Sequence, residues 1–159
     1  SANLSESVYN QAVKLGEAGK IQESLNLLNQ IKGNYAKAKT LYDSMNSFHK
    51  KVSLWLGTWK HRGTVNGEKT TYYITFSEVL YKGEPCIKIK DMNNKSLGYD
   101  VEISSKNHIT QIEVGKYMIH FKLKNNHNQK LTYTLLEGKK MLRELKYEGV
   151  TYKTKYKKK

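Results

Sequence analysis

The side chains best suited to catalysis or metal binding are five histidines and one cysteine. Because Cys86 is alone, the chain has no internal disulfide and no cysteine-based zinc site, and no base is identifiable beside its thiol. A hairpin is expected to turn at Gly115-Lys116. In that hairpin His120 faces Gln111 and does not meet His108, so the spacing predicts no pair of histidines that could bind a metal. We interpret the following as surface or structural residues: His49, His61, His108, His120, His127 and Cys86.

Catalytic sequence motifs are also missing. The chain contains no Gly-x-Ser-x-Gly, His-Glu-x-x-His, P-loop or dinucleotide-binding fingerprint. Its acidic residues are scattered, so no pair of carboxylates is predicted to share acid–base work. The sequence therefore predicts a protein that is not an enzyme and that takes no cofactor and no metal.

The charge of the chain points to a class of partner. Its 159 residues carry a formal net charge of +14, and all but two of the 28 basic side chains are lysines. Residues 1–53 hold 7 basic and 4 acidic side chains, whereas residues 54–159 hold 21 and 10. Lysine is a hydrated point charge and lacks the planar fork with which arginine recognises phosphate or guanine. The composition indicates diffuse attraction to a polyanion; solubility and an A/T-rich coding bias are the alternative explanation.

The elements that must position these side chains change in character near Trp55. Before it, apolar residues recur every three or four positions and predict helices over residues 4–18, 20–32 and from 34 to about 52. After it, apolar and polar residues alternate between turn signals spaced by roughly 9–16 residues. Among these, Asn66-Gly67 is the strongest signal for a two-residue hairpin turn. We expect an α+β protein: a helical region over 1–53, then an antiparallel meander of eight to nine strands over 54–159, closed as a barrel or split into a sandwich.

The helical region resembles a single tetratricopeptide-type repeat. Small residues at Ala12 and Ser24 would let two antiparallel helices approach closely, and Gly19 lies at the turn. The match departs from the family at Ile31 and Ala36, and a lone repeat does not build a solenoid. The resemblance implies a helical hairpin, joined by a third helix, that acts as a spacer or docks a protein partner.

The opening of the strand region resembles the calycin group, the lipocalins and their relatives. Gly57-x-Trp59 stands on the first strand, and in that group the Trp closes the barrel floor beneath a basic side chain from a late strand. Here Arg143 shares an apolar strand face with Met141 and Leu145, and a cation–π contact with Trp59 would account for it. A long helical region before the barrel and no helix near the end are departures from the group.

Two kinds of binding are expected of such a barrel. It holds a small apolar ligand, with Tyr72, Tyr117 and Tyr133 lining the interior, or it is filled and presents a basic surface to an anionic membrane or wall polymer. The basic contact residues would be Lys153, Lys155, Lys157, Lys158 and Lys159, unless they form a solvated end without a role. We expect a bacterial cell-surface or secreted protein whose targeting segment lies upstream of this chain. Single-stranded nucleic acid is the alternative partner, disfavoured because the tyrosines alternate onto apolar faces and arginine is scarce.

Overall fold

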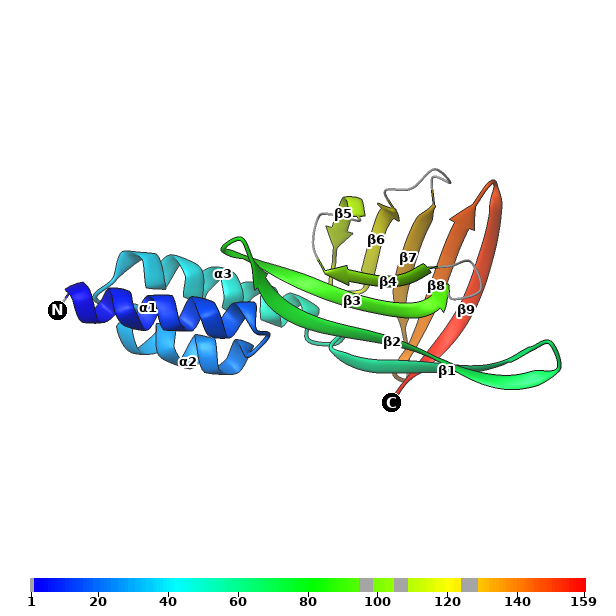
Figure 1. Cartoon of the computed structure of the whole chain (residues 1–159), viewed down its shortest axis with the longest axis horizontal. Coiled ribbons are helices and arrows are strands. Elements are labelled where there is room, and N and C mark those ends of the chain that lie inside the picture. Colours follow the sequence, from blue (N-terminus) through cyan, green and yellow to red (C-terminus); the bar gives the residue numbers. More distant parts are fainter. Residues whose placement is uncertain (1, 95–98, 105–108, 124–128) are drawn as a thin grey trace. The chain divides into compact units, whose positions relative to one another are not determined.

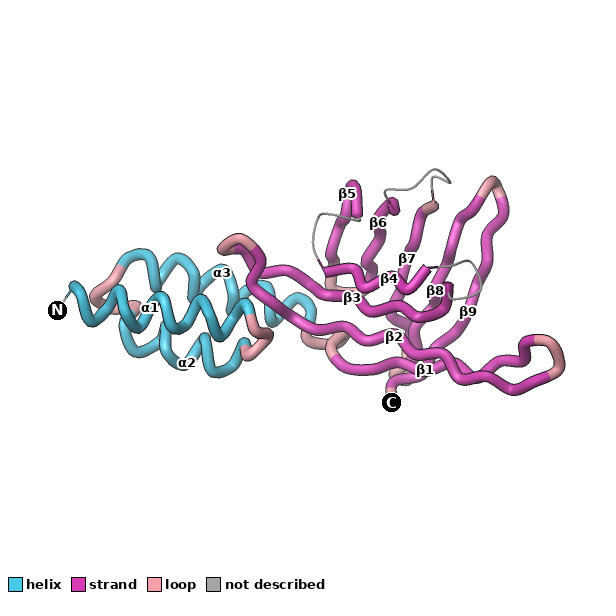
Figure 2. Tube along the Cα trace, in the orientation of Figure 1, coloured by secondary structure: helices cyan, strands magenta, loops and turns pink. Residues whose placement is uncertain are grey.

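The fold is described from a computed structural model, which places residues 2–94, 99–104, 109–123 and 129–159. Three helices come first: α1 (Ala2–Glu17), α2 (Ile21–Ile31) and α3 (Ala36–Val52). Nine strands follow: β1 (Gly57–Val65), β2 (Glu68–Tyr81), β3 (Glu84–Asn94), β4 (Tyr99–Ser104), β5 (Ile109–Val114), β6 (Met118–Leu123), β7 (Lys130–Leu136), β8 (Lys140–Tyr147) and β9 (Val150–Lys158). The α+β class and the antiparallel meander are thereby confirmed (Figures 1 and 2).

The chain divides into two compact units. The first comprises Ser1–Ser53 together with Ser77–Ile87, the turn between β2 and β3 and the strand ends beside it. The second comprises Leu54–Phe76 and Lys88–Lys159. Residues 77–87, which the sequence pattern assigns to the strand region, thus group with the helices, because Leu80 is buried in the helical core. Among the described residues, no helix is both long enough and apolar enough to cross a membrane.

The helical unit is held by one apolar core with small residues at the closest helix approach. Ala12 and Ser24 are both fully buried, and the Ser24 hydroxyl donates a hydrogen bond of 2.6 Å to the Ala12 carbonyl. That bond joins α1 to α2 directly and satisfies a buried hydroxyl. The core consists of Ala12, Leu25, Leu28, Ala38, Leu41, Met45 and Leu80.

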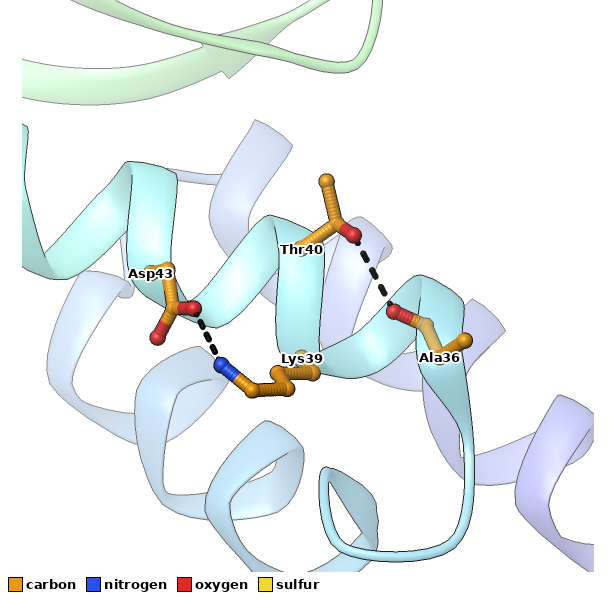
Figure 3. A network of polar contacts seen from close by, with 4 residues as sticks. All are labelled: Ala36, Lys39, Thr40 and Asp43. Carbon is orange, nitrogen blue, oxygen red and sulfur yellow. Dashed lines mark hydrogen bonds and ion pairs between the residues drawn. The ribbon is translucent and has the colours of Figure 1, made fainter.

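The exposed side of α3 is stabilised locally. Lys39 and Asp43, one turn apart, form an ion pair of 2.7 Å, and the Thr40 hydroxyl donates to the Ala36 carbonyl at 3.2 Å (Figure 3). An exposed pair at this spacing contributes about 0.3–0.5 kcal/mol to a helix. In the same unit, His49 on α3 meets Glu78 at 2.5 Å (Nδ1 to Oε1), which provides a partner for a carboxylate that is 7% exposed.

The sheet is one curled antiparallel layer in the order β4-β3-β2-β1-β9-β8-β7-β6-β5. Chain neighbours therefore pair with each other, and the first strand pairs with the last through Trp59 opposite Lys158 and Lys60 opposite Lys157. The two ends of the sheet, β4 and β5, are consecutive in the chain. The result is a strongly curled half-barrel, in which β1 and β9 pair in the middle of the sheet and the strand order is open, from β4 at one end to β5 at the other.

Three two-residue turns and one three-residue turn, between β7 and β8, set the register of the hairpins. Asn66 and Gly67 have φ values of 51° and 82°, the doubly positive pair that a type I′ turn requires. The same pattern recurs at residues 82–83, 138–139 and 148–149. Because each turn is this short, the alternation of side chains passes from one strand to the next without a slip.

Side chains on the inner face of the strand unit form its core. The rings of Phe76 on β2 and Tyr133 on β7 lie 5.3 Å apart at 88°, and Tyr133 also packs against Phe121 on β6. Three strands, β1, β9 and β8, separate β2 from β7 in the sheet, so their side chains can touch only because the sheet curls. The largest inner side chains, each at most 2% exposed, are Trp55, Trp59, Ile74, Phe76, Ile89, Ile119, Phe121, Tyr133, Met141 and Tyr156.

Candidate functional site

The inner face of the strand unit contains one charged cluster. Asp91 on β3 accepts two hydrogen bonds at Oδ2, from the Tyr133 hydroxyl and from Arg143 Nε, both at 2.7 Å. Tyr133 and Arg143 are directly opposite each other on β7 and β8. Asp91 and Tyr133 are fully buried, and Arg143 is 4% exposed.

The electrostatics of this cluster indicate a structural role. Burial raises the pKa of the Tyr133 hydroxyl well above its ordinary value, and the neighbouring Asp91 charge adds to the rise. Burial, the largest single effect, disfavours the charged form of Arg143, but the charge and hydrogen bond of Asp91 together with the neighbouring Tyr133 and Tyr156 outweigh it, and the pKa of the guanidinium is raised. The cluster thus combines an ion pair of Arg143 and Asp91 with the neutral phenol of Tyr133. Because its members expose almost no surface, it offers no approach for a reactant.

The sequence analysis did not identify Asp91. A signal was present, since Asp91 continues the face of Ile87 and Ile89, two buried residues on the same strand. A carboxylate and a guanidinium that each occupy an apolar strand face are expected to find one another, because an unpaired buried charge is very costly. Arg143 therefore has a buried carboxylate partner in Asp91, which accounts for a guanidinium on an apolar face, and the contact with Trp59 stays a prediction.

Gly57 and Trp59 both lie beside the side chain of Lys158. Lys158 Nζ lies 4.8 Å from the centroid of the Trp59 ring and also donates to the carbonyls of Leu54 and Leu56. Trp59 is 2% exposed, and its indole donates to the Trp55 carbonyl at 2.9 Å. Gly57 has φ +112°, and a Cβ there would lie 3.3 Å from Lys158 Cε. The glycine thus permits both the backbone conformation and the approach of the lysine.

The three tyrosines expected to line a ligand cavity occupy three different environments. Tyr133 is fully buried and hydrogen-bonded to Asp91, so its side chain borders no space that a water molecule could enter. Tyr117 is 58% exposed, in the turn between β5 and β6. Tyr72 is half-buried and stacks on His61, with ring centroids 6.1 Å apart. The structure does not bring these three side chains together around one space.

Each of the histidines in the described part of the strand unit contacts a different partner. His120 lies opposite Glu113 and not opposite Gln111, because the irregularity between Thr110 and Glu113 shifts the register, and its Nε2 is 2.9 Å from the Glu113 carboxylate. His61 Nδ1 meets the Lys155 carbonyl at 3.0 Å. His108 and His127 lie outside the described residues. Within the described part of the chain, no three His, Cys, Asp or Glu side chains gather as a potential metal site.

The lysines near the end of the chain belong to a central strand of the sheet. Lys153, Lys155 and Lys157 alternate with the buried Tyr156 and are exposed on the outer face of β9. Lys158 points inward to Trp59, where burial lowers the pKa of its ammonium and the charge of Lys139 lowers it further. Lys159 places its Nζ 5.4 Å from the centroid of the Tyr73 ring. The expected set of five thus divides into three outer lysines, one inner lysine and one terminal lysine.

The outer lysines of β9 are part of a larger basic surface. Lys157 is directly opposite Lys60 on β1 and also directly opposite Lys140 on β8. These three define the first lysine row, which crosses three adjacent strands. Like charges in directly opposed positions destabilise a sheet, by up to about 1 kcal/mol per pair.

A second lysine row crosses β6, β7 and β8. Lys122 is opposite Lys130, and Lys130 is opposite Lys146. Lys140 and Lys146 are six residues apart on β8, so at about 3.3 Å per residue the two rows are separated by about 20 Å. Both rows lie on the outer face, because they alternate with the buried residues of the same strands.

We define the lysine face as the outer side of β1, β7, β8 and β9. Its basic side chains number eight and its carboxylates one, Glu144, which is opposite Lys153. The lysine face therefore carries a net +7, half of the formal +14 of the chain. The basic members are Lys60, Arg62, Lys130, Lys140, Lys146, Lys153, Lys155 and Lys157.

The lysine face is an extended, positively charged surface. The ammonium groups are exposed, come from paired strands of one sheet, and repeat at the spacing of the strands, about 4.8 Å across and 6–7 Å along. Such an array attracts extended negative charge. Comparison with models of protein families, with curated proteins and with solved structures finds no match for this chain.

Proposed function

We propose that this protein is a non-enzymatic binding module whose lysine face engages an extended anionic partner. The observation that supports the proposal is the pair of lysine rows, in which like charges directly oppose each other across three strands. Repulsion between the lysines of each row lowers the stability of the isolated protein. An anionic partner neutralises these charges and thereby removes the repulsion.

The packing of the inner face favours an external partner over an internal ligand. The large core side chains around Tyr133 expose at most 2% of their surface. A space large enough for an apolar ligand would be lined by such side chains and would leave them accessible. The proposal therefore places the partner on the outer face, next to the described core.

The proposal includes the two family resemblances, to lipocalins and to tetratricopeptide repeats. A lipocalin-like origin is supported by Trp59 beneath a lysine of the last strand. A tetratricopeptide-like hairpin is supported by the close approach of α1 and α2 at Ala12 and Ser24. On these resemblances we propose a role at the bacterial cell surface or outside the cell, with the helices as a spacer or as a docking face for another protein.

The test is binding to a soluble polyanion, fluorescent dextran sulfate, measured by anisotropy over a salt series. The variant Lys140→Glu/Lys157→Glu reverses two charges of the first lysine row. The control Lys20→Glu/Lys50→Glu makes the same change in net charge on exposed lysines of the helical unit. We expect the first variant to weaken binding by about tenfold or more and to lower the salt slope, and the control to weaken it by less than about twofold. Equal losses in both variants would show that only net charge matters and would remove the lysine face as the site.

A further inference from the structure

Exposed apolar side chains lie on the outer side of the sheet, on β7 and β8 of the lysine face and on the neighbouring strand β6. Met118 on β6 is 48% exposed and Leu136 on β7 is 38% exposed, whereas Leu142 on β8 is half-buried. All three are outer-face residues, since they alternate with the buried residues of their strands. We call these three residues the apolar patch.

The register makes the apolar patch continuous. Met118 is opposite Thr134, which is two positions from Leu136 on β7. Leu136 is opposite Lys140, which is two positions from Leu142 on β8. Leu136 is thus a diagonal neighbour of both other members, at the 7–8 Å that separates such positions in an antiparallel sheet.

Lysines directly border the apolar patch. Leu136 is opposite Lys140 of the first lysine row, and Leu142 is opposite Lys155 on β9. The second lysine row lies farther along the same strands, beyond residues 120, 132 and 144. The surface therefore combines ammonium groups with apolar side chains that project between them from the same side of the sheet.

This combination distinguishes among anionic partners. A hydrophilic polymer, such as a wall polyanion, gains nothing from an exposed methionine and leucine. Single-stranded nucleic acid is bound mainly by aromatic stacking together with basic grooves. The exposed ring beside the first lysine row is Tyr73, opposite Lys60, and Lys159 Nζ lies 5.4 Å from its centroid, whereas the apolar patch contains no ring. An anionic bilayer uses both features, because headgroups attract lysines while apolar side chains enter the boundary of the acyl region.

We propose that the lysine face and the apolar patch form a docking surface for an anionic lipid bilayer. Met118 and Leu136 enter the interface, and Lys140, Lys155 and Lys157 lie at the level of the headgroups, where their long side chains reach the phosphates. This inference rests on the proposed function, since it names the class of anionic partner that the lysine face binds.

The test is flotation of the full chain with vesicles of phosphatidylcholine alone and with vesicles that also contain about 30% of the anionic lipid phosphatidylglycerol, which makes the surface potential negative. We expect binding to the anionic vesicles only. The variant Met118→Ser/Leu136→Ser should weaken that binding by about tenfold, because two apolar side chains no longer enter the interface. The matched control is Val150→Ser, which removes an equally exposed apolar side chain (50%) at the β8–β9 turn and should change binding by less than about twofold.

A second measurement reports insertion directly. Tryptophan introduced by Leu136→Trp should shift its emission to shorter wavelength on addition of anionic vesicles and should be quenched by brominated acyl chains, whereas Val150→Trp should show neither effect. Both positions are exposed, so both substitutions leave the core intact.

The outcomes separate this inference from the proposed function. If Met118→Ser/Leu136→Ser binds vesicles as well as the parent chain, and Leu136→Trp shows no shift, insertion is refuted. If the chain binds dextran sulfate or a single-stranded oligonucleotide through the lysine face but ignores vesicles, the lipid surface is refuted and the proposed function survives. If it binds no polyanion and no vesicle, both are refuted.

Discussion

The buried pair of Asp91 and Arg143 makes the strand unit sensitive to one conservative change, Asp91→Asn. This substitution keeps the size of the side chain and an oxygen that can accept hydrogen bonds, but it removes the negative charge. Arg143, only 4% exposed, keeps its positive charge and loses the carboxylate 2.7 Å from its Nε. The variant therefore measures how much the charge of Asp91 contributes to stabilising the buried cation of Arg143.

The expected loss follows from this geometry. Removing one partner of a buried ion pair costs about 3–5 kcal/mol, because the remaining charge is left without compensation. We expect Asp91→Asn to lie near 3 kcal/mol, since its amide oxygen still accepts a hydrogen bond. Tyr133→Phe deletes only the hydroxyl donated to Asp91 at 2.7 Å and should cost about 1–2 kcal/mol.

The assay is urea unfolding followed by tryptophan fluorescence. Trp55 and Trp59 are the two tryptophans of the chain, and both belong to the strand unit. Their emission therefore reports unfolding of this unit even if the helical unit unfolds in a separate transition. A constant slope of free energy against urea should accompany a lower midpoint for Asp91→Asn.

A rescue experiment decides whether charge is the cause. Adding Arg143→Met to Asp91→Asn removes the buried cation and retains much of its volume, so it should recover about 2 kcal/mol or more of the loss. The reasoning is refuted if Asp91→Asn costs less than about 1 kcal/mol, or if the double variant is less stable than the single one.

Three further predictions concern titration, the lysine rows and the helical core. The pKa of Tyr133 is raised in the folded state, so its contribution to stability is complete below the unfolded pKa of about 10 and is lost as the pH rises beyond it. Above pH 10 the unfolding free energy of the parent chain should therefore fall more steeply with pH than that of Tyr133→Phe, by up to about 1.4 kcal/mol per pH unit. Lys157→Glu should stabilise the strand unit by about 0.5–1 kcal/mol at low salt by placing a carboxylate inside the first lysine row, whereas Lys155→Glu, opposite a leucine, should change it by less than about 0.3 kcal/mol. Gly16→Ala should destabilise the helical unit by about 1–2 kcal/mol, measured by far-UV circular dichroism, because the new methyl group overlaps the side chain of Leu80.

Each of these has a control or a contrary outcome. Equal alkaline slopes for the parent chain and Tyr133→Phe would mean that the Tyr133 hydroxyl ionises freely in the folded state. A stabilisation by Lys157→Glu that persists in 1 M salt, where the screening length is about 3 Å, would not be electrostatic. Gly33→Ala is the control for the helical unit, since nothing lies within 4 Å of the new methyl group. If Gly16→Ala is as stable as Gly33→Ala, the packing of Leu80 against α1 is looser than the structure indicates.

Local features of the fold followed from the sequence alone. The three helices begin and end within about two residues of the expected ranges, because a period of three to four residues is a property of each segment by itself. The turn at Asn66 and Gly67 was predicted for the same reason, since these two residues adopt positive φ readily. Alternation then assigned inner and outer faces, such as buried Ile119 and Phe121, without knowledge of partner strands.

Pairings between distant segments were decided only by the tertiary structure. Arg143 was recognised as unusual on an apolar face, but the sequence could not choose between Trp59 and Asp91 as its partner, because that choice depends on how far the sheet curls. The same curl and the β1–β9 pairing bring Lys158 over Trp59 and place Lys60 beside Lys157. The lysine composition therefore indicated a polyanionic partner. The lysine rows, in contrast, exist only because the strands pair in registers that place lysines directly opposite each other.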